Sequence, residues 1–334
     1  MRAITHDRFA EPDEVLEVTE RPTPEPGPGQ VRVRTLLATI HNHDLWTVRG
    51  TYGFKPELPA GSGTEAVGVI EALGEGVTGL AVGQRVAAGG VFGVWAEQFL
   101  APTKALIPVD DALPDEAAAQ LVAMPFSAIS LLHSLDLKAG DWLIQNAANG
   151  AVGRMVAQIA ADRGIHVVGL VRRAAAVDEL AAQGITGIVA TDGGAADGSG
   201  SPDDWRDRVA ALTGGAPIAA AVDSVGGEST SDLVSVLGDD GHLVVFGAMD
   251  ADKVALPTGP IIFRQLTISG FWGSRVSRDM DPAVRGQLFG DLGRLIAEGK
   301  LTLPVAAIHP LEEIRDAVRA TFTPGRVGKV LLRP

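Results

Sequence analysis

Residues 141–153 read DWLIQNAANGAVG and join a short apolar run to a turn of small residues. Residues 151–161 carry apolar side chains at helical spacing, so the pattern predicts a strand, a tight turn and a helix. Unpaired N–H groups at the start of such a helix favour binding of a pyrophosphate. Gly150 would let the backbone approach the phosphates, and Gly153 would let the helix pack closely on the strand. This stretch therefore predicts a dinucleotide-binding turn.

The residues after this turn indicate which dinucleotide binds. Residues 166–170 predict the next strand, which leads into Arg172 and Arg173. An acidic residue at that place would bind the ribose hydroxyls of NAD, whereas arginines can pair with the 2′-phosphate of NADP. Ala148 replaces the first glycine of the usual glycine pattern, so a plain turn with solvated arginines is the alternative. The chain has a strand, a turn, a helix and a second strand that ends in two arginines, and this combination favours an NADPH site.

Length and composition restrict the class of protein. A chain of 334 residues can form two domains, and 46% apolar with 21% charged residues is typical of a soluble fold. No apolar run is long enough to span a membrane, and the first residues lack a signal-like apolar stretch, so we expect a cytoplasmic protein. The absence of cysteine excludes disulfides and thiolate ligands. The net charge of −13 argues against nucleic acid as a partner.

The order of the predicted elements indicates two domains. Short strands with intervening glycines, such as residues 31–35 and 66–72, predict a small antiparallel barrel in the first part of the chain. A helix is expected over residues 117–135. Six strands then alternate with helices, which predicts a doubly wound parallel sheet: residues 142–146, 166–170, 185–190, 218–222, 242–247 and 266–271.

Two segments of the chain resemble those of a known superfamily. Residues 63–68 read GTEAVG and, with Gly74 and Val77, match the barrel signature of the medium-chain dehydrogenases/reductases, except that Thr64 replaces the usual histidine. Residues 147–153 resemble the cofactor motif of the zinc-independent branch. The resemblance covers nearly the whole chain. It implies an α/β protein with a GroES-like barrel substrate domain at residues 1–118, completed by 275–334, and a Rossmann NADPH-binding domain at 119–274.

The resemblance also bears on metal binding. The zinc enzymes of this superfamily hold their catalytic ion at positions that correspond here to His41, Thr64 and Met124. Threonine and methionine are poor zinc ligands, so we expect no metal. His41 and His43 would share a face on a strand and could bind a metal by themselves; a hydrogen-bonded or solvated pair is the alternative. Without a Lewis acid, reduction of an activated C=C bond is favoured over alcohol dehydrogenation.

Tyr52 is the candidate catalytic residue. Residues 144–149, 222–227 and 268–272 most resemble the 2-enoyl thioester reductases of mitochondrial type, in which a tyrosine of a Gly-x-Tyr-Gly stretch contacts nicotinamide and substrate. Residues 50–53 read GTYG and contain the only tyrosine of the chain. Hydride addition to the β-carbon of an enoyl thioester forms an enolate, which needs a hydrogen-bond donor and then a proton. The alternative is an amphipathic tyrosine in a cleft.

The resemblance implies further site residues. Those expected to contact the cofactor are Asn149, Gly150, Ala151, Val152, Gly153, Arg172, Arg173, Phe246, Gly247, Ala248, Met249, Phe271, Trp272, Gly273, Ser274 and Lys329. Those expected in the substrate pocket are His41, Asn42, Met124 and Trp272. The alternatives are core aromatics at a domain seam for 271–272 and an exposed strand-end lysine for 329. The sequence HNHD at 41–44 replaces an asparagine-proline pair of this branch, and Met124 replaces an asparagine that contacts the cofactor, so the substrate can differ from a long acyl thioester.

Together these patterns predict an NADPH-dependent reductase of an α,β-unsaturated carbonyl, with a 2-enoyl thioester as the first choice of substrate. A quinone or small-enone reductase would share every cofactor feature. A protein that binds NADPH as a sensor, with little turnover, is the alternative from another class. The strand predicted at residues 266–271 would lie at the edge of its sheet, and exposed apolar edges tend to be paired, so we expect a homodimer.

Overall fold

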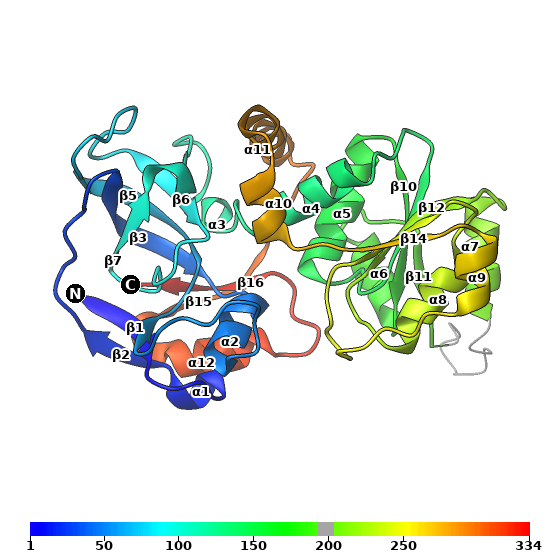
Figure 1. The fold of residues 1–334 in the computed structure, drawn as a ribbon, viewed down its shortest axis with the longest axis horizontal. Coiled ribbons are helices and arrows are strands. Elements are labelled where there is room, and N and C mark those ends of the chain that lie inside the picture. The colour runs from blue at the N-terminus through cyan, green and yellow to red at the C-terminus, as the bar shows by residue number, and fades with distance from the viewer. Residues whose placement is uncertain (193–203) are drawn as a thin grey trace. The chain divides into compact units, whose positions relative to one another are not determined.

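A computed structural model of the chain describes residues 1–192 and 204–334. The chain forms two compact units (Figure 1), and each has its own hydrophobic core. Residues 1–124 and 303–334 form the first unit, called here the barrel domain, and residues 125–302 form the second, called the nucleotide domain. No helix in the described residues is long and apolar enough to cross a membrane.

The barrel domain is built from two sheets. The larger sheet has the order β15-β16-β3-β5-β6-β8, with β7 also paired to β3, and the smaller has the order β2-β1-β4. All pairs in the barrel domain are antiparallel except β15 with β16. The strands are β1 (Arg2–His6), β2 (Glu17–Glu20), β3 (Gln30–Thr39), β4 (Ala60–Gly61), β5 (Glu65–Leu73), β6 (Arg85–Gly89), β7 (Gln98–Pro102), β8 (Leu106–Pro108), β15 (Val305–Pro310) and β16 (Lys329–Arg333).

Alternating apolar residues of these strands form the core of the barrel domain. Val31 and Val33 of β3 point inward. Arg32 and Arg34, which alternate with these valines along the strand, form ion pairs with Glu71 of β5. Trp95 is fully buried, and its indole N–H donates to the Thr39 carbonyl at 3.0 Å. The helices of this domain are α1 (Pro12–Val15), α2 (Asn42–Arg49), α3 (Asp115–Ala118) and α12 (Ile314–Thr321).

The nucleotide domain contains a six-stranded sheet in which every pair is parallel. Its order is β11-β10-β9-β12-β13-β14, so the first strand lies in the middle and the chain moves outward in two directions. This order places a topological switch point between β9 and β12, where such sheets bind ligands. The strands are β9 (Trp142–Gln145), β10 (His166–Val171), β11 (Ile188–Ala190), β12 (Ile218–Asp223), β13 (His242–Val245) and β14 (Thr267–Gly270).

Helices connect these strands and cover the sheet. Val168 and Leu170 of β10 pack in one cluster with residues of α7 and α8, while Val171 packs in another with residues of α6. Successive side chains of a strand point to opposite faces, so these two clusters lie on the two sides of the sheet. The helices are α4 (Met124–Ser134), α5 (Ala151–Asp162), α6 (Ala175–Ala181), α7 (Asp204–Thr213), α8 (Glu228–Val236), α9 (Thr258–Phe263), α10 (Gly273–Asp279) and α11 (Pro282–Ala297).

The structure differs from the sequence prediction at two boundaries. The helix expected over residues 117–135 is two helices, α3 and α4, because Pro125 lacks an N–H and is accommodated in the first turn of a new helix. The C-terminal boundary lies at residue 302 instead of 274, so α10 and α11 belong to the nucleotide domain. The Phe289 ring of α11 stacks on Phe126 of α4 at 4.5 Å between centroids, which ties this helix to that domain.

Candidate functional site

The cofactor turn of the nucleotide domain has the geometry expected for a phosphate-binding loop. β9 ends at Gln145, and α5 starts at Ala151 with Gly150 as its N-cap. A Cβ on Gly153 would lie 2.8 Å from the Ala148 Cα, so only glycine permits this close packing of helix and turn. The Gln145 amide donates to the Gly153 carbonyl at 2.7 Å and fixes the first turn of the helix. Asn149 is exposed, and Ala151 and Val152 are half-buried.

A basic cluster lies at the carboxyl end of β10. Arg172 and Arg173 directly follow this strand and are exposed, and Arg173 lies 3.8 Å from Glu179 of α6. Arg154 of α5, which sequence reasoning missed, is buried and leaves its Nε without a hydrogen-bond partner among the described residues. Burial lowers the pKa of Arg154, and the charge of Glu179 opposes this effect. The exposed guanidinium groups of Arg172 and Arg173 are of the kind that pairs with a phosphate monoester.

The remaining predicted cofactor residues of this domain lie at the carboxyl ends of β13 and β14. Phe246 stacks on Phe271 with ring centroids 5.4 Å apart, and a Cβ on Gly247 would lie 3.0 Å from the Ser224 carbonyl oxygen. Trp272 is 46% exposed and lines, with Phe271 and residues of α10, a hollow of about 600 Å³. Gly273 packs against Ser127, whereas Ala248, Met249 and Ser274 are exposed. At this exposure, Trp272 is not part of the core of the nucleotide domain.

The switch point between β9 and β12 contains a hydrogen-bond network that sequence reasoning missed. Asn146 donates to the buried Asp223 carboxylate at 2.6 Å and accepts from the Ser224 N–H at 2.7 Å. The same carboxylate accepts from the N–H groups of Val225 and Gly226 and from the hydroxyl of Thr230. Asn146 and Asp223 both lie in the stretches that carry the family resemblance, and that resemblance was the signal that could have identified them. The network fixes the loop after β12 beside the cofactor turn.

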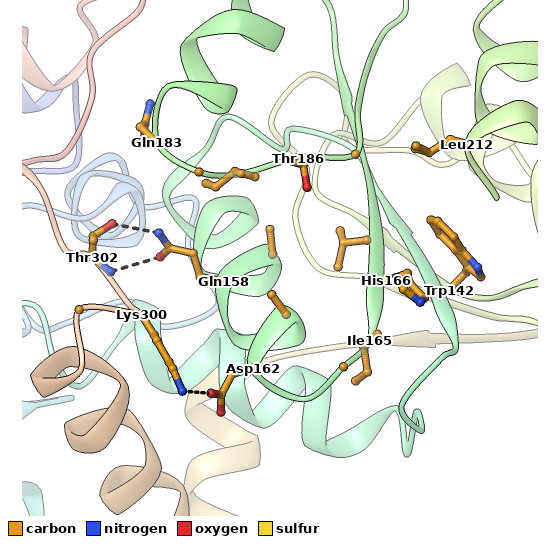
Figure 2. Close-up of a pocket in the computed structure, with 18 residues that line it drawn as sticks. Trp142, Gln158, Asp162, Ile165, His166, Gln183, Thr186, Leu212, Lys300 and Thr302 are labelled. Carbon is orange, nitrogen blue, oxygen red and sulfur yellow. Dashed lines mark hydrogen bonds and ion pairs between the residues drawn. The ribbon is translucent and has the colours of Figure 1, made fainter.

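A second hollow of this domain, of about 890 Å³, lies at the opposite end of the strands. Figure 2 shows two polar pairs along it, Gln158 with Thr302 and Asp162 with Lys300. Trp142 and His166, which begin β9 and β10, line it. Ligands of open parallel sheets bind at the carboxyl ends of strands, and this hollow lies at the amino ends. We therefore assign it no part in the cofactor site.

The barrel domain contains a cluster of buried ionisable side chains around the start of α2. His41 is the N-cap of this helix, and its Nε2 lies 2.5 Å from Glu65 Oε2 with both side chains fully buried. The other oxygen of Glu65 accepts from the N–H groups of Val122 and Ala123. Asp44 accepts from the His41 N–H at 2.9 Å. Residues 41–44 therefore begin a helix, which corrects the strand considered for the two histidines.

Burial determines the protonation of this cluster. It raises the pKa of Glu65 to about 7, although the two backbone donors favour the carboxylate. It lowers the pKa of His41 well below the ordinary value, and nearby Lys329 adds to this effect. Lys329 is itself buried, which lowers its pKa to about 8. The alternative that Lys329 is an exposed strand-end lysine is therefore wrong, and its position beside Asp44 and Glu65 was not evident from sequence.

Tyr52 lies next to this cluster. Its half-buried ring has its centroid 5.7 Å from that of His43, and the His43 ring stacks on His41 at 4.9 Å. His43 Nε2 lies 2.8 Å from the Thr64 hydroxyl, which donates to Asp44 at 2.6 Å. Asn42 is exposed and Met124 is half-buried. His41 was expected in the substrate pocket, but it has no exposed surface and lies behind His43.

These side chains do not form a zinc site. The Thr64 hydroxyl is already bonded to Asp44 and His43, His41 Nε2 is bonded to Glu65, and Met124 offers only a thioether. Among residues 1–192 and 204–334, no group of three or more histidine, cysteine or acidic residues is placed to hold a metal ion. The hydrogen-bonded alternative for His41 and His43 therefore describes both rings.

Comparison with known proteins identifies the family. Residues 27–111 match the model of the alcohol dehydrogenase GroES-like domain, and residues 151–286 match that of the zinc-binding dehydrogenase. The mitochondrial enoyl-[acyl-carrier-protein] reductase of Homo sapiens is 31% identical over 99% of this chain and 88% of its own length. The chain is therefore an oxidoreductase with GroES-like and Rossmann domains, and it belongs to the quinone oxidoreductase-like group of the medium-chain dehydrogenase/reductase superfamily.

Two solved structures extend the likeness to the fold. A mycobacterial protein complexed with NADPH is 26% identical with a TM-score of 0.86, and the match covers 100% of both chains. A quinone oxidoreductase of Pseudomonas syringae is 25% identical with a TM-score of 0.85, covering 100% of this chain and 99% of its own. The expected fold class, a GroES-like barrel domain with a Rossmann domain, is confirmed.

Proposed function

We propose that this oxidoreductase uses NADPH to reduce the C=C bond of an α,β-unsaturated thioester, of the 2-enoyl type. The observation that carries the proposal is the position of Tyr52, whose ring lies beside His43 in a cluster where Thr64 is bonded to Asp44. Such a site offers a phenol as proton donor and does not offer the ligands that a Lewis acid needs. Enoyl-[acyl-carrier-protein] reductases that align with 99% of the chain support this substrate class.

The nucleotide domain fits NADPH. Gly150 lets the backbone approach a pyrophosphate at the start of α5, where the N–H groups of the first helical turn lack helical acceptors, and Gly153 lets that helix pack on the turn. Arg172 and Arg173 are placed to bind the 2′-phosphate, and the exposed Trp272 with Phe271 borders the hollow at the ends of β13 and β14. When bound, NADPH supplies the hydride for the reduction.

The barrel domain supplies the proton. Hydride addition to the β-carbon leaves negative charge on the thioester oxygen, and that charge is stabilised by a hydrogen-bond donor. The α-carbon must then take up a proton. A phenol keeps its hydrogen at neutral pH, so Tyr52 can donate it to the enolate directly or through one water. Phe54, two residues from Tyr52, lies against Phe92 with the ring centroids 4.7 Å apart. Both rings are exposed, so they offer an apolar surface to an acyl chain.

A quinone or a small enone is the second candidate substrate, favoured by the likeness to the quinone oxidoreductase fold. We expect the purified protein to oxidise NADPH with a trans-2-enoyl thioester, and Tyr52→Phe to lower kcat about 100-fold, which is typical of a lost general acid. The measurement is the loss of NADPH absorbance with each substrate in turn.

The comparison of the two substrates decides between the candidates. Tyr52→Phe keeps the ring and its packing, so a loss of activity would be assigned to the hydroxyl. Turnover of the quinone alone, unchanged in Tyr52→Phe, would contradict the enoyl thioester proposal and assign the protein to the quinone reductases.

A further inference from the structure

In the cluster of ionisable side chains around the start of α2, His43 is the histidine that has an exposed face. Its side chain is 20% exposed, whereas the side chains of His41, Asp44 and Glu65 are fully buried. Its ring lies between those of His41 and Tyr52, with centroid distances of 4.9 and 5.7 Å. A group that exchanges protons with a substrate or solvent must be reachable from outside. In this cluster, His43 and Tyr52 meet that condition and His41 does not.

Hydrogen bonds fix the orientation and the tautomer of His43. Asp44 accepts from the Thr64 hydroxyl at 2.6 Å, and this bond uses the only hydrogen of that hydroxyl. The Thr64 oxygen, 2.8 Å from His43 Nε2, can therefore only accept from it. The other neighbour of Nε2 is Asp44 Oδ1 at 3.6 Å, which is also an acceptor. Nε2 must carry the hydrogen, and Nδ1 is left as the nitrogen that gains or loses a proton.

Titratable groups from three elements surround His43. On its own helix, Asp44 Oδ1 lies 3.6 Å from His43 Nε2 and also accepts from Thr64, while the buried His41 ring stacks on the His43 ring. From the other elements, the buried Glu65 of β5 and Lys329 of β16 face the same cluster. Histidine is also the side chain that changes charge near neutral pH.

We propose that His43 resupplies the proton that Tyr52 donates, which rests on the proposed reduction of a C=C bond. The Tyr52 O–H bond breaks as its proton goes to the α-carbon of the enolate. The phenolate then takes the Nδ1 proton of the His43 imidazolium, directly or through one water. The neutral His43, still bonded through Nε2–H to Thr64, takes a proton from solvent. His43 acts through Tyr52 and is a positioning and proton-supply residue; Thr64 and Asp44 hold it in the required tautomer.

The tautomer can be measured without any substrate. Nitrogen NMR of the full-length protein with ¹⁵N-labelled histidine distinguishes protonated from unprotonated ring nitrogens, and the His43→Gln variant assigns the signal. We expect neutral His43 to carry hydrogen on Nε2, and we expect Thr64→Val to release this preference while Thr64→Ser retains it. A His43 signal with hydrogen on Nδ1 in the unmodified protein would overturn the proposal.

The role in turnover needs a variant that keeps the hydrogen bond. In His43→Gln, the side-chain amide can still donate to Thr64, but no nitrogen titrates. We expect kcat for the enoyl thioester to fall about 100-fold with little change in KM, at the lower end of the range of proton-transfer catalysis. We also expect the pH profile of kcat in this variant to lack any step that depends on the imidazole. Unchanged kcat and pH profile, with activity still lost in Tyr52→Phe, would overturn the proposal for His43 alone.

Failure of the proposed function gives a different result. If the protein reduces only a quinone, the enoyl thioester is excluded, and the same His43→Gln comparison is made with the quinone, whose reduction also consumes protons. A loss of kcat and of the pH dependence there would support His43, and their retention would overturn it. An enzyme that turns over neither substrate overturns both proposals together.

Discussion

Glu65 and His41 lie side by side in the barrel core, and their protonation follows from that burial. The pKa of Glu65 is raised to about 7 and that of His41 is lowered, in both cases chiefly by removal from water. Below about pH 7 the Glu65 carboxyl is therefore protonated beside the uncharged His41, whose Nε2 lies 2.5 Å from Glu65 Oε2. The second carboxylate oxygen holds the N–H groups of Val122 and Ala123, which directly precede α4. Glu65 thus contacts both His41 of the site and the backbone of Val122 and Ala123 that leads into α4.

We expect Glu65→Ala to lower the free energy of unfolding by ~3–5 kcal/mol, the usual cost of removing one partner of a buried pair. His41 Nε2 would lose its hydrogen-bond partner, and the two backbone N–H groups would lose their acceptor, in a buried part of the site. Glu65→Gln is the matched control, because its amide oxygen can accept from the backbone and its NH₂ can donate to His41. Chemical denaturation at constant pH measures both variants. Equal stability of Glu65→Ala and the unmodified protein would contradict the role of this pair.

At the scale of elements, the cofactor half of the fold could be predicted from local patterns. Strand, turn and helix around Gly150 follow from apolar spacing and small residues, and the structure places β9 and α5 where they were expected. The start of α2 could not be predicted in this way. His41, Asn42, His43 and Asp44 give a weak helical pattern, and the helix begins there because Asp44 accepts from the His41 N–H and Thr64 bonds to Asp44.

The barrel-domain cluster shows why the rest of the site was not predictable. Thr64 was noticed only as a missing zinc ligand, although it connects His43 to Asp44. Lys329 comes from the last strand, more than 260 residues from Glu65, and its burial beside that carboxyl depends on the pairing of β16 with β3. Sequence spacing carries no information about such a contact. The family resemblance identified which residues belong to the site, and the three-dimensional structure was needed to show which residues they contact.

The link between α5 and α11 gives a pH-dependent prediction. Asp162, the last residue of α5, bonds to Arg294 of α11 at 2.7 Å and to Lys300 at 2.8 Å, and these cations lower its pKa from 3.8 to about 2. A lowered pKa in the folded state means that the unfolded chain binds the proton more readily. The stabilisation is therefore complete above pH 3.8 and is lost as the pH falls through about 2.

We expect Asp162→Asn to lack this contribution, so the variant should be less stable than the unmodified protein near neutral pH. The difference between the two should shrink as the pH falls from about 4 to 2, within the window of that pKa. Denaturant unfolding at several pH values measures it, with Asp279→Asn, on an exposed ion pair of α10, as the control. A difference that stays constant across this range would show that the cations do not stabilise the Asp162 carboxylate.

At the scale of the whole molecule, one edge of the nucleotide sheet is open. β14 is the last strand in the sheet order and pairs with β13 alone among the described residues. The preceding helix α9 exposes apolar side chains, with Ile262 at 54% and Phe263 at 84%. An exposed strand edge beside apolar side chains is a surface that natural proteins tend to cover. We propose that a second copy of the chain covers it, giving a homodimer with β14 at the interface.

This proposal predicts that the unmodified protein has the mass of a dimer in size-exclusion chromatography with light scattering. Phe263→Asp should shift it to the monomer, because a charge replaces the most exposed large apolar side chain at that edge. Phe322→Asp is the control: Phe322 is also 53% exposed, but it lies at the end of α12 in the barrel domain and contacts Arg49. Circular dichroism checks that both variants fold. A monomeric unmodified protein, or a Phe263→Asp variant that remains dimeric, would place the β14 edge outside any interface.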